Sequence, residues 1–237
     1  MRFGRCAVRW GLLALVLTTA RGARAQTAIE EAGRPLVRPP VWEVAGGVRT
    51  MFIEERGYDP FSADDALVQF SLTATRALVR ADSLALVAGV GLDLGGSSAT
   101  ARGAPSSLTL TRVSALAEGR YQPLSQLYLF ARLAPGLLHG SATIDDASSP
   151  TASGGLNGDF DSFSLDASGG GAFCFGDVGR LHVGAWLIAD GGYGWVAAKP
   201  LVLAPPLGAD QSKAGTLDLG TLAARGGFFR IALALSY

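Results

Sequence analysis

The chain is poor in lysine. Only Lys199 and Lys213 occur among its 237 residues, which carry 20 Lys+Arg against 20 Asp+Glu. A formal charge of zero argues against a nucleic-acid-binding protein, because such a protein would show a basic excess. Soluble domains usually cover themselves with Lys and Glu, so the scarcity of lysine indicates a surface that does not face water everywhere.

The first 25 residues have the pattern of a secretory signal. Three arginines at positions 2, 5 and 9 precede the apolar run 10–17, and Ala23-Arg24-Ala25 follows as a small-x-small cleavage site. The run is shorter than the roughly 20 residues that a membrane-spanning helix needs. We therefore expect export and cleavage after Ala25. Cleavage would remove five arginines and no acid, which leaves 15 basic against 20 acidic residues.

Cysteine is nearly absent from the expected mature chain. Cys6 lies in the signal, so Cys174 alone remains, and an intrachain disulfide is excluded despite the oxidising route of export. No later segment contains about 18 consecutive apolar residues, which excludes transmembrane helices. Residues 26–40 include three prolines and are expected to form an extended periplasmic lead-in before the folded part, 41–237.

What dominates the folded part is a period of two. In the stretch 68–73, for example, valine, phenylalanine and leucine alternate with glutamine, serine and threonine. Such alternation places one set of side chains on each face of a strand. Eight segments share the pattern, and each reaches the roughly 9–11 residues that a tilted strand needs to cross a bilayer. The expected strands are 41–53, 66–78, 83–95, 107–121, 127–138, 162–176, 181–196 and 225–237.

The connections between these segments alternate between short and long. By the boundaries above they contain 12, 4, 11, 5, 23, 4 and 28 residues, and the short ones hold turn-forming residues. This asymmetry is typical of outer-membrane barrels, which have short periplasmic turns and longer external loops. An even number of strands places both ends of the chain on the periplasmic side.

Charged residues occupy the strand face opposite the apolar set. An ordinary solvent-exposed face is rarely so evenly matched in sign, whereas a closed interior needs matched charges because an unpaired buried charge is costly. Small residues between the charges leave room for long arginine side chains in a narrow barrel. The alternative is a two-sheet sandwich with a polar exterior. The expected interior network consists of Glu43, Arg49, Asp93, Arg112, Glu118, Arg120, Arg132, Asp166, Asp190 and Arg230.

Aromatic residues of the apolar set gather near the strand ends. Two such belts are expected where a barrel meets the two interfaces of a bilayer. The expected periplasmic belt contains Trp42, Tyr121, Phe173, Phe175 and Tyr237, and the expected external belt contains Phe52, Phe163, Tyr193 and Trp195.

The last strand carries the most specific pattern. Its outward residues would be Phe229, Ile231, Leu233, Leu235 and Tyr237. This pattern resembles the C-terminal strand of bacterial outer-membrane β-barrels, whose terminal aromatic residue is part of the signal for barrel assembly. Segments 118–124 and 127–133 are similar to the central hairpin of small eight-stranded outer-membrane proteins. The resemblance implies localisation in the outer membrane, contact with its lipid and lipopolysaccharide, and the barrel-assembly machinery as a partner during biogenesis.

Motifs for catalysis, metals or cofactors are few. The chain contains no HExxH, no CxxC pair, no glycine-rich phosphate loop and no GxSxG. No metal site and no cofactor are expected; the acidic pairs Asp145-Asp146 and Asp159/Asp161 read as solvated loop residues rather than as cation ligands. His182 and Cys174 are expected to face inward, where a histidine with satisfied hydrogen bonds and a small packing residue are the ordinary interpretations.

His139 and Ser141 form the one candidate catalytic pair. His139 has the parity of the lipid-facing set, and Ser141 follows two residues later. Outer-membrane lipid A deacylases are similar in pairing a lipid-facing histidine with such a serine, and the resemblance implies that His139 acts as a general base. This chain departs from that pattern: no asparagine directly follows Ser141, and no glutamate occurs after Glu118. Asp145 or Asp146 would have to orient the imidazole.

Together these patterns predict an all-β protein, an eight-stranded antiparallel up-and-down transmembrane β-barrel. We expect a monomer that is not an enzyme and binds no nucleic acid, with a charge-paired, closed interior and two long external loops that serve structural or surface-interaction roles. The main alternative is a narrow channel or carrier for small hydrophobic molecules. A lipid A-modifying enzyme using His139 and Ser141 is the second alternative.

Overall fold

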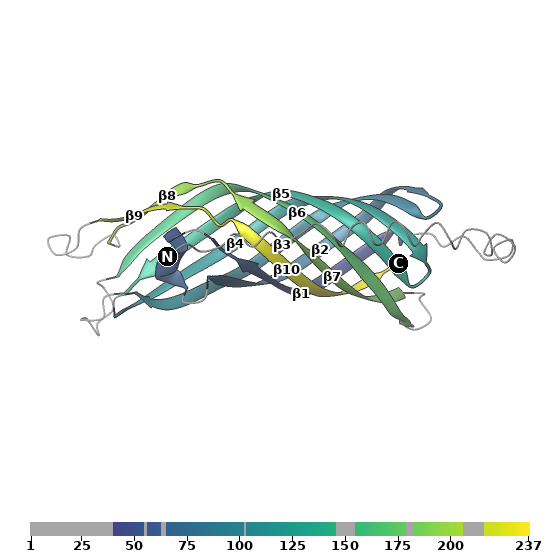
Figure 1. The fold of residues 1–237 in the computed structure, drawn as a ribbon, viewed down its shortest axis with the longest axis horizontal. Coiled ribbons are helices and arrows are strands. Elements are labelled where there is room, and N and C mark those ends of the chain that lie inside the picture. Colours follow the sequence, from purple (N-terminus) through teal and green to yellow (C-terminus); the bar gives the residue numbers. More distant parts are fainter. Residues whose placement is uncertain are drawn as a thin grey trace, which may run out of the picture. The chain divides into compact units, whose positions relative to one another are not determined.

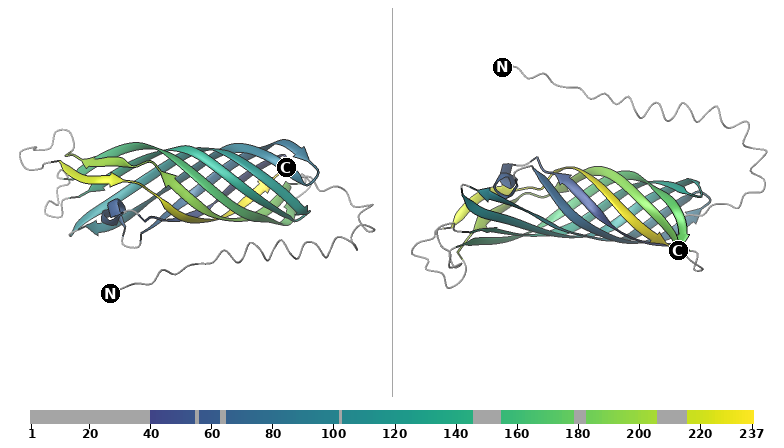
Figure 2. Two further views of the ribbon diagram at one scale, coloured as in Figure 1. Left: turned by 45° about the horizontal axis from the view of Figure 1, so that its top comes forward. Right: turned by 90° about the horizontal axis from the view of Figure 1, so that it is seen from below.

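The computed structural model describes residues 40–54, 56–62, 65–101, 103–145, 155–178, 183–205 and 216–237. Eight of its strands form a closed antiparallel barrel in the order β1-β10-β7-β6-β5-β4-β3-β2, which confirms the expected fold class (Figures 1 and 2). The expected signal, 1–25, and all but the last residue of the expected lead-in, 26–40, lie outside the described residues.

Each barrel strand pairs with its neighbour in the chain, and the first strand pairs with the last. The β1–β10 register runs from Glu43 opposite Ser236 to Met51 opposite Phe228, which closes the ring. No helix in the described ranges is both long and apolar enough to span a membrane. The elements are β1 (Trp42–Phe52), η3 (Arg56–Phe61), β2 (Ala66–Ala81), β3 (Leu84–Ala101), β4 (Ala104–Leu124), β5 (Leu127–Ile144), β6 (Leu156–Val178), β7 (Val183–Val196), β8 (Lys199–Leu203), β9 (Leu217–Leu222) and β10 (Gly226–Ser236).

The two ends of the barrel differ. At one, which we call the turn end, strands are joined by tight turns such as the one at Asp82, whose φ of 49° lies in the left-handed region that Asp tolerates. At the other, the loop end, lie the short 3-10 helix η3 and the two-stranded sheet β8–β9 (Figure 1). Segment 197–224 was expected to be one continuous loop, but it contains the strands β8 and β9.

The strands reach further at the loop end than their sequence pattern predicts. The expected connection 96–106 is mostly strand, because β3 and β4 pair as far as Ala101 opposite Ala104. Gly103 makes the turn with a φ of +87°. Likewise, β5 continues to Ile144 and β6 already starts at Leu156, although a loop was expected at 139–161. In the extensions of β5 and β6 the outward residues are polar, so the outward apolar set that marked the expected strands stops before these strands end.

The register aligns polar and apolar outward residues into rows across β4, β5 and β6. Val113, Leu137 and Phe163 are direct cross-strand partners and form the last apolar row. The next rows toward the loop end are polar: Thr111, His139 and Asp161; Thr109, Ser141 and Asp159; Ser107, Thr143 and Asn157. On β4, β5 and β6 the boundary of the apolar band therefore lies between the Val113 row and the Thr111 row.

Below that boundary the outer wall is apolar. Trp42, Tyr121 and Phe173 expose about half of their surface near the turn end, and Phe52 and Tyr193 do so toward the loop end. All nine residues of the two expected aromatic belts are exposed on the outside. This inside-out distribution, with an exposed apolar wall and buried charges, is that of a transmembrane β-barrel.

The interior has three layers, which can be followed along the inward face of single strands. On β10 the order is Phe228, then Arg230, then Ala232 and Ala234. An apolar cluster fills the loop end, charged residues fill the middle, and an aromatic cluster containing Tyr128, Phe130 and Trp186 fills the turn end. The expectation of a charged interior thus describes the middle of the barrel, whereas both ends are apolar.

A charge introduced into the apolar wall tests the position of the band. Leu133 faces outward near the middle of the apolar stretch of β5, whereas Ser107 lies in the outermost polar row. We predict that Leu133→Arg lowers the free energy of unfolding by about 2–4 kcal/mol and that Ser107→Arg changes it by less than about 1 kcal/mol. Denaturant unfolding in lipid vesicles measures both, and equal effects would contradict the assignment.

Candidate functional site

Ten charged side chains inside the barrel form two clusters. The first, nearer the loop end, contains Arg49, Arg112, Asp93 and Asp166. Arg49 lies 3.4 Å from the Asp93 carboxylate and 3.0 Å from that of Asp166, and Arg112 pairs with the same two carboxylates. Arg112 also donates to the Ser164 hydroxyl at 2.9 Å and to the Ala134 carbonyl at 2.6 Å. Each guanidinium therefore bridges both acids.

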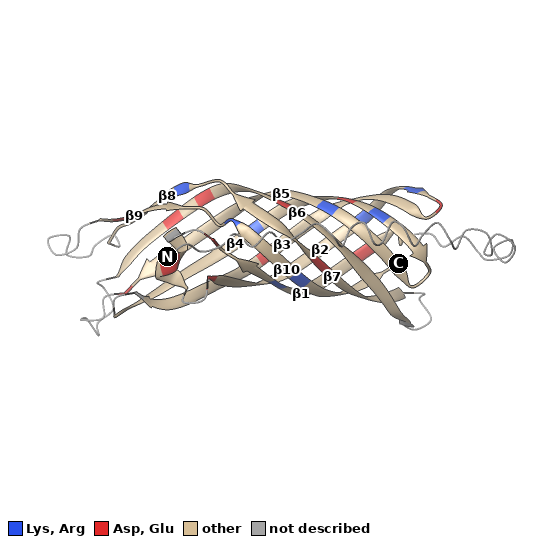
Figure 3. Cartoon of the chain, in the orientation of Figure 1, with Lys and Arg blue, Asp and Glu red and all other residues tan. Residues whose placement is uncertain are grey.

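The second cluster is a chain of alternating charge nearer the turn end. Arg120 binds Glu43 at 2.7 Å and also pairs with Glu118. Glu118 accepts from Arg132 at 2.6 Å, and Arg230 binds both oxygens of Asp190 at 2.8 Å. Arg132 and Asp190 lie 3.9 Å apart and link the two parts. Figure 3 shows both signs of charge along the barrel strands.

Small residues make room for these side chains. A Cβ at Gly194 would lie 2.9 Å from Asp166 Oδ1 and 3.1 Å from Arg49 Nη2, so glycine leaves the space that the first cluster occupies. The arginines also stack on aromatic rings at the two borders of the charged layer. Arg49 lies 4.3 Å from the ring centre of Phe228, and Arg120 lies 4.6 Å from that of Tyr128.

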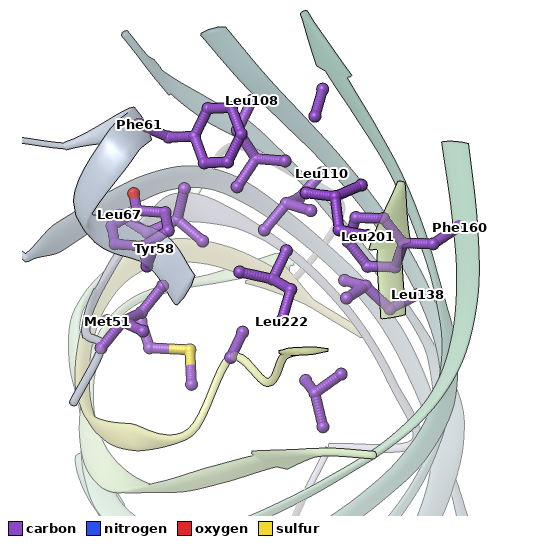
Figure 4. Close-up of a cluster of buried hydrophobic side chains, with 14 of the residues drawn as sticks. Met51, Tyr58, Phe61, Leu67, Leu108, Leu110, Leu138, Phe160, Leu201 and Leu222 are labelled. Carbon is purple, nitrogen blue, oxygen red and sulfur yellow. The ribbon is translucent and has the colours of Figure 1, made fainter. Parts of the chain in front are cut away.

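Side chains of η3, β8 and β9 pack over the loop end of the barrel. Tyr58 and Phe61 of η3 and Leu201, Leu203 and Leu222 of the β8–β9 sheet are all buried against inward side chains of the barrel (Figure 4). Burial raises the pKa of the Tyr58 hydroxyl above its ordinary value because it disfavours the phenolate. This cap was missed in the sequence analysis, which treated 54–65 and 197–224 as external loops.

Aromatic side chains pack together inside the turn end. Tyr128 is fully buried, stacks on Trp186 with ring centres 5.0 Å apart, and donates a 2.8 Å hydrogen bond to Glu43. The Trp186 indole donates to the Ser236 hydroxyl at 2.7 Å. Cys174 packs partly buried against this aromatic cluster. His182, which was expected to face inward nearby, lies outside the described residues.

The space left between the interior side chains is small. One cavity of about 20 Å³ lies between the two charge clusters. A second, of about 10 Å³, lies between the first cluster and the apolar layer. In the described part of the chain no group of three or more His, Cys, Asp or Glu side chains is arranged to hold a metal ion.

The speculative catalytic pair lies on the outer wall. His139 and Ser141 both face outward on β5, in the first two polar rows beyond the apolar band. His139 Nδ1 lies 2.9 Å from Asp161 Oδ1, and both side chains are more than half exposed. Asp161 is thus an acid beside the imidazole; Asp145 or Asp146 was expected there, and Asp146 lies outside the described residues. No hydrogen bond joins His139 to Ser141 within the described residues.

The residues of the expected assembly signal line the outside of β10. Phe229, Ile231, Leu233 and Leu235 expose about half of their surface, and Tyr237 exposes 73%. The Tyr237 backbone exchanges 2.9 Å hydrogen bonds with Trp42, where the last residue meets the first strand. The aromatic end of the chain therefore lies at the seam that closes the ring.

No family model matches the sequence, and no curated protein sequence matches it. Similar solved structures include Ail, the attachment invasion locus protein of Yersinia pestis, in complex with the heparin analogue sucrose octasulfate (13% identity, TM-score 0.46, 84% of this chain and 99% of that chain). Neisserial surface protein A gives 12% identity and a TM-score of 0.46 over 84% and 99% of the two chains. The translocator domain of the autotransporter NalP from Neisseria meningitidis gives 11% identity and a TM-score of 0.41 over 95% of this chain and 97% of that chain.

Glu118 is the test of the charged interior, because it is fully buried between Arg120 and Arg132. Glu118→Gln leaves two buried guanidinium groups without this counter-charge, and we predict a loss of about 3–5 kcal/mol in the free energy of unfolding. Glu54→Gln, at an exposed carboxylate outside the barrel, should change it by less than about 0.5 kcal/mol. Urea unfolding measures both. A loss at Glu118 no larger than that at Glu54 would contradict a structural role for the network.

Proposed function

We propose that this chain is a closed, non-enzymatic outer-membrane barrel that acts as a structural and surface-interaction protein. The observation that carries the proposal is the filled interior: an apolar cap, two charge clusters and an aromatic cluster follow one another, and the two cavities beside the charge clusters measure about 20 and 10 Å³. Such an interior supports a barrel whose useful surfaces are external.

The external surfaces suit the two sides of an outer-membrane interface. Lipid would cover the apolar wall, including a groove of about 670 Å³ lined by Leu84, Tyr121, Leu129 and other side chains. The polar rows on β4–β6 would lie among lipopolysaccharide head groups and sugars, and the tips of β3–β6 would extend beyond them. These rows offer hydroxyl, amide and carboxylate groups for contacts outside the lipid.

Conductance across planar bilayers tests the closed interior. We predict no steady current for the wild-type protein. Replacing residues 199–222 by a short turn removes the β8–β9 part of the cap, yet current should stay low because the charge clusters still fill the barrel. Heat-modifiable migration on a gel verifies that each protein is folded. A large, steady conductance of the folded wild type would refute the proposal.

Removal of the outermost polar row separates surface interaction from transport. We predict that Ser107→Ala, Thr143→Ala and Asn157→Ala together weaken adhesion of cells that carry the protein, because outward polar groups are lost while inward packing is kept. Uptake of a hydrophobic fluorescent dye should be the same as in cells without the protein. Dye uptake that depends on the protein would favour a carrier for small hydrophobic molecules, with the apolar loop-end interior as its entrance.

One observation favours a second candidate, an ester hydrolase acting on outer-leaflet lipid. His139 Nδ1 contacts Asp161, and Ser141 lies two residues along the same outward face, directly beyond the apolar band. In this candidate Ser141 attacks an acyl-ester carbonyl while His139 accepts its proton, and Asp161 holds the imidazole tautomer. Protonation of the leaving alcohol and hydrolysis of the acyl-serine would release a fatty acid.

The hydrolase candidate is tested on lipid A and phospholipid by mass spectrometry of the released acyl chains. If it is correct, Ser141→Ala lowers the rate by about 10³-fold or more, and Asp161→Asn lowers it strongly, because the nucleophile and the orienting acid are lost. Thr143→Ala, at the next outward position of the same strand, should keep full activity. Intact acyl chains after incubation with the folded wild type would eliminate this candidate.

A further inference from the structure

The cavity between the two charge clusters has an unusual lining. It is enclosed by side chains from both clusters, and guanidinium groups outnumber carboxylates among them. Its charged lining consists of Arg49, Arg112, Arg132, Arg230, Asp93 and Asp166. The lining is therefore rich in hydrogen-bond donors, because each guanidinium carries five N–H groups and no acceptor.

Two of these donors have no hydrogen-bond partner among the described residues. They are Arg132 Nη1 and Arg49 Nε, on side chains that are each only 4% exposed. Arg132 Nη1 forms an ion pair with Asp190 Oδ2. The two atoms lie 3.9 Å apart, which is too far for a hydrogen bond. Leaving a buried charged donor unpaired is costly, so the site calls for an acceptor.

The size of the cavity limits what that acceptor is. A volume of about 20 Å³ exceeds the roughly 10–15 Å³ that one water needs, so there is space for a single small species. The neighbouring cavity, at about 10 Å³, lies at the lower edge of this range, and its lining includes the apolar side chains Met51, Leu67 and Leu138 beside Arg49 and Arg112. Of these two cavities, the one between the clusters is the larger, and it is lined by both arginines that carry an unpaired donor.

We propose that this cavity is a binding site for one small hydrogen-bond acceptor, a water molecule or a halide ion, held by Arg132 and Arg49. The species accepts from a member of each cluster and so joins the two clusters into one network through the middle of the barrel. A water would also donate to Asp93 or Asp166, which line the same space. A halide would accept from the guanidinium groups alone.

A methyl group added at Gly91 tests the site, because the two interpretations of the cavity predict different changes in the unfolding temperature. Gly91 lines the cavity, and its Cβ would lie 2.8 Å from Ser114 Oγ and at least 3.6 Å from Leu116. We therefore add Gly91→Ala to a Ser114→Ala background, which removes the close contact. Filling a dry cavity would raise the unfolding temperature or leave it unchanged. Displacing a bound acceptor would leave Arg132 Nη1 and Arg49 Nε without a hydrogen-bond partner. In that case we expect the unfolding temperature to fall by about 2–10 °C.

Gly46→Ala is the matched control, because Gly46 faces outward and its Cβ would meet only flexible side chains, the nearer being Leu72 at 3.4 Å. It carries the same backbone change without touching the cavity. Crystals grown in sodium bromide distinguish the two acceptors. Anomalous density between Arg49 and Arg132 identifies a halide, and ordinary density for one atom identifies a water; either supports the site. No density there, or an unfolding temperature that Gly91→Ala raises or leaves unchanged relative to the effect of the control, would overturn it.

Discussion

Five guanidinium groups lie in a space that the barrel wall shields from water, and the rest of the structure depends on their being matched. Five carboxylates, supplied by β1, β3, β4, β6 and β7, provide the match only in one register of the strands. A slip of one residue at any pair would turn that strand's charges toward lipid and its leucines inward. The charge clusters therefore select a single arrangement from the many that alternation alone permits.

Apolar layers border the charged side chains at both ends of the barrel. η3 approaches β9 closely at Gly57, where a Cβ would lie 2.6 Å from the Thr221 carbonyl oxygen, and together they cover the loop end. Tyr128 and Trp186 cover the turn end while Tyr128 still reaches Glu43. The ten charged side chains between these layers are buried, and burial strengthens each ion pair and increases the cost of an unpaired charge.

Alternation in the sequence predicted all eight barrel strands and the inward side of Glu43, Arg120 and Asp190, because a period of two is a local property. It failed for Ser97–Ala101, where small and polar residues occupy both faces, and for β8–β9, whose burial depends on the barrel beneath them. The contact of His139 with Asp161 depends on the β5–β6 register over 22 residues of chain. No spacing within one strand encodes it, so Asp161 was not among the acids expected beside His139, which were Asp145 and Asp146.

The seam between β1 and β10 has a consequence for how the chain reaches its folded form. Glu43 pairs with Ser236, so the ring closes through the longest sequence separation in the barrel. Every other strand pair is available as a hairpin or near-neighbour contact, but an incomplete sheet keeps two open edges until the last strand arrives. Closure of the ring therefore removes the last open edges of the sheet, and it requires that both partners of the seam are present.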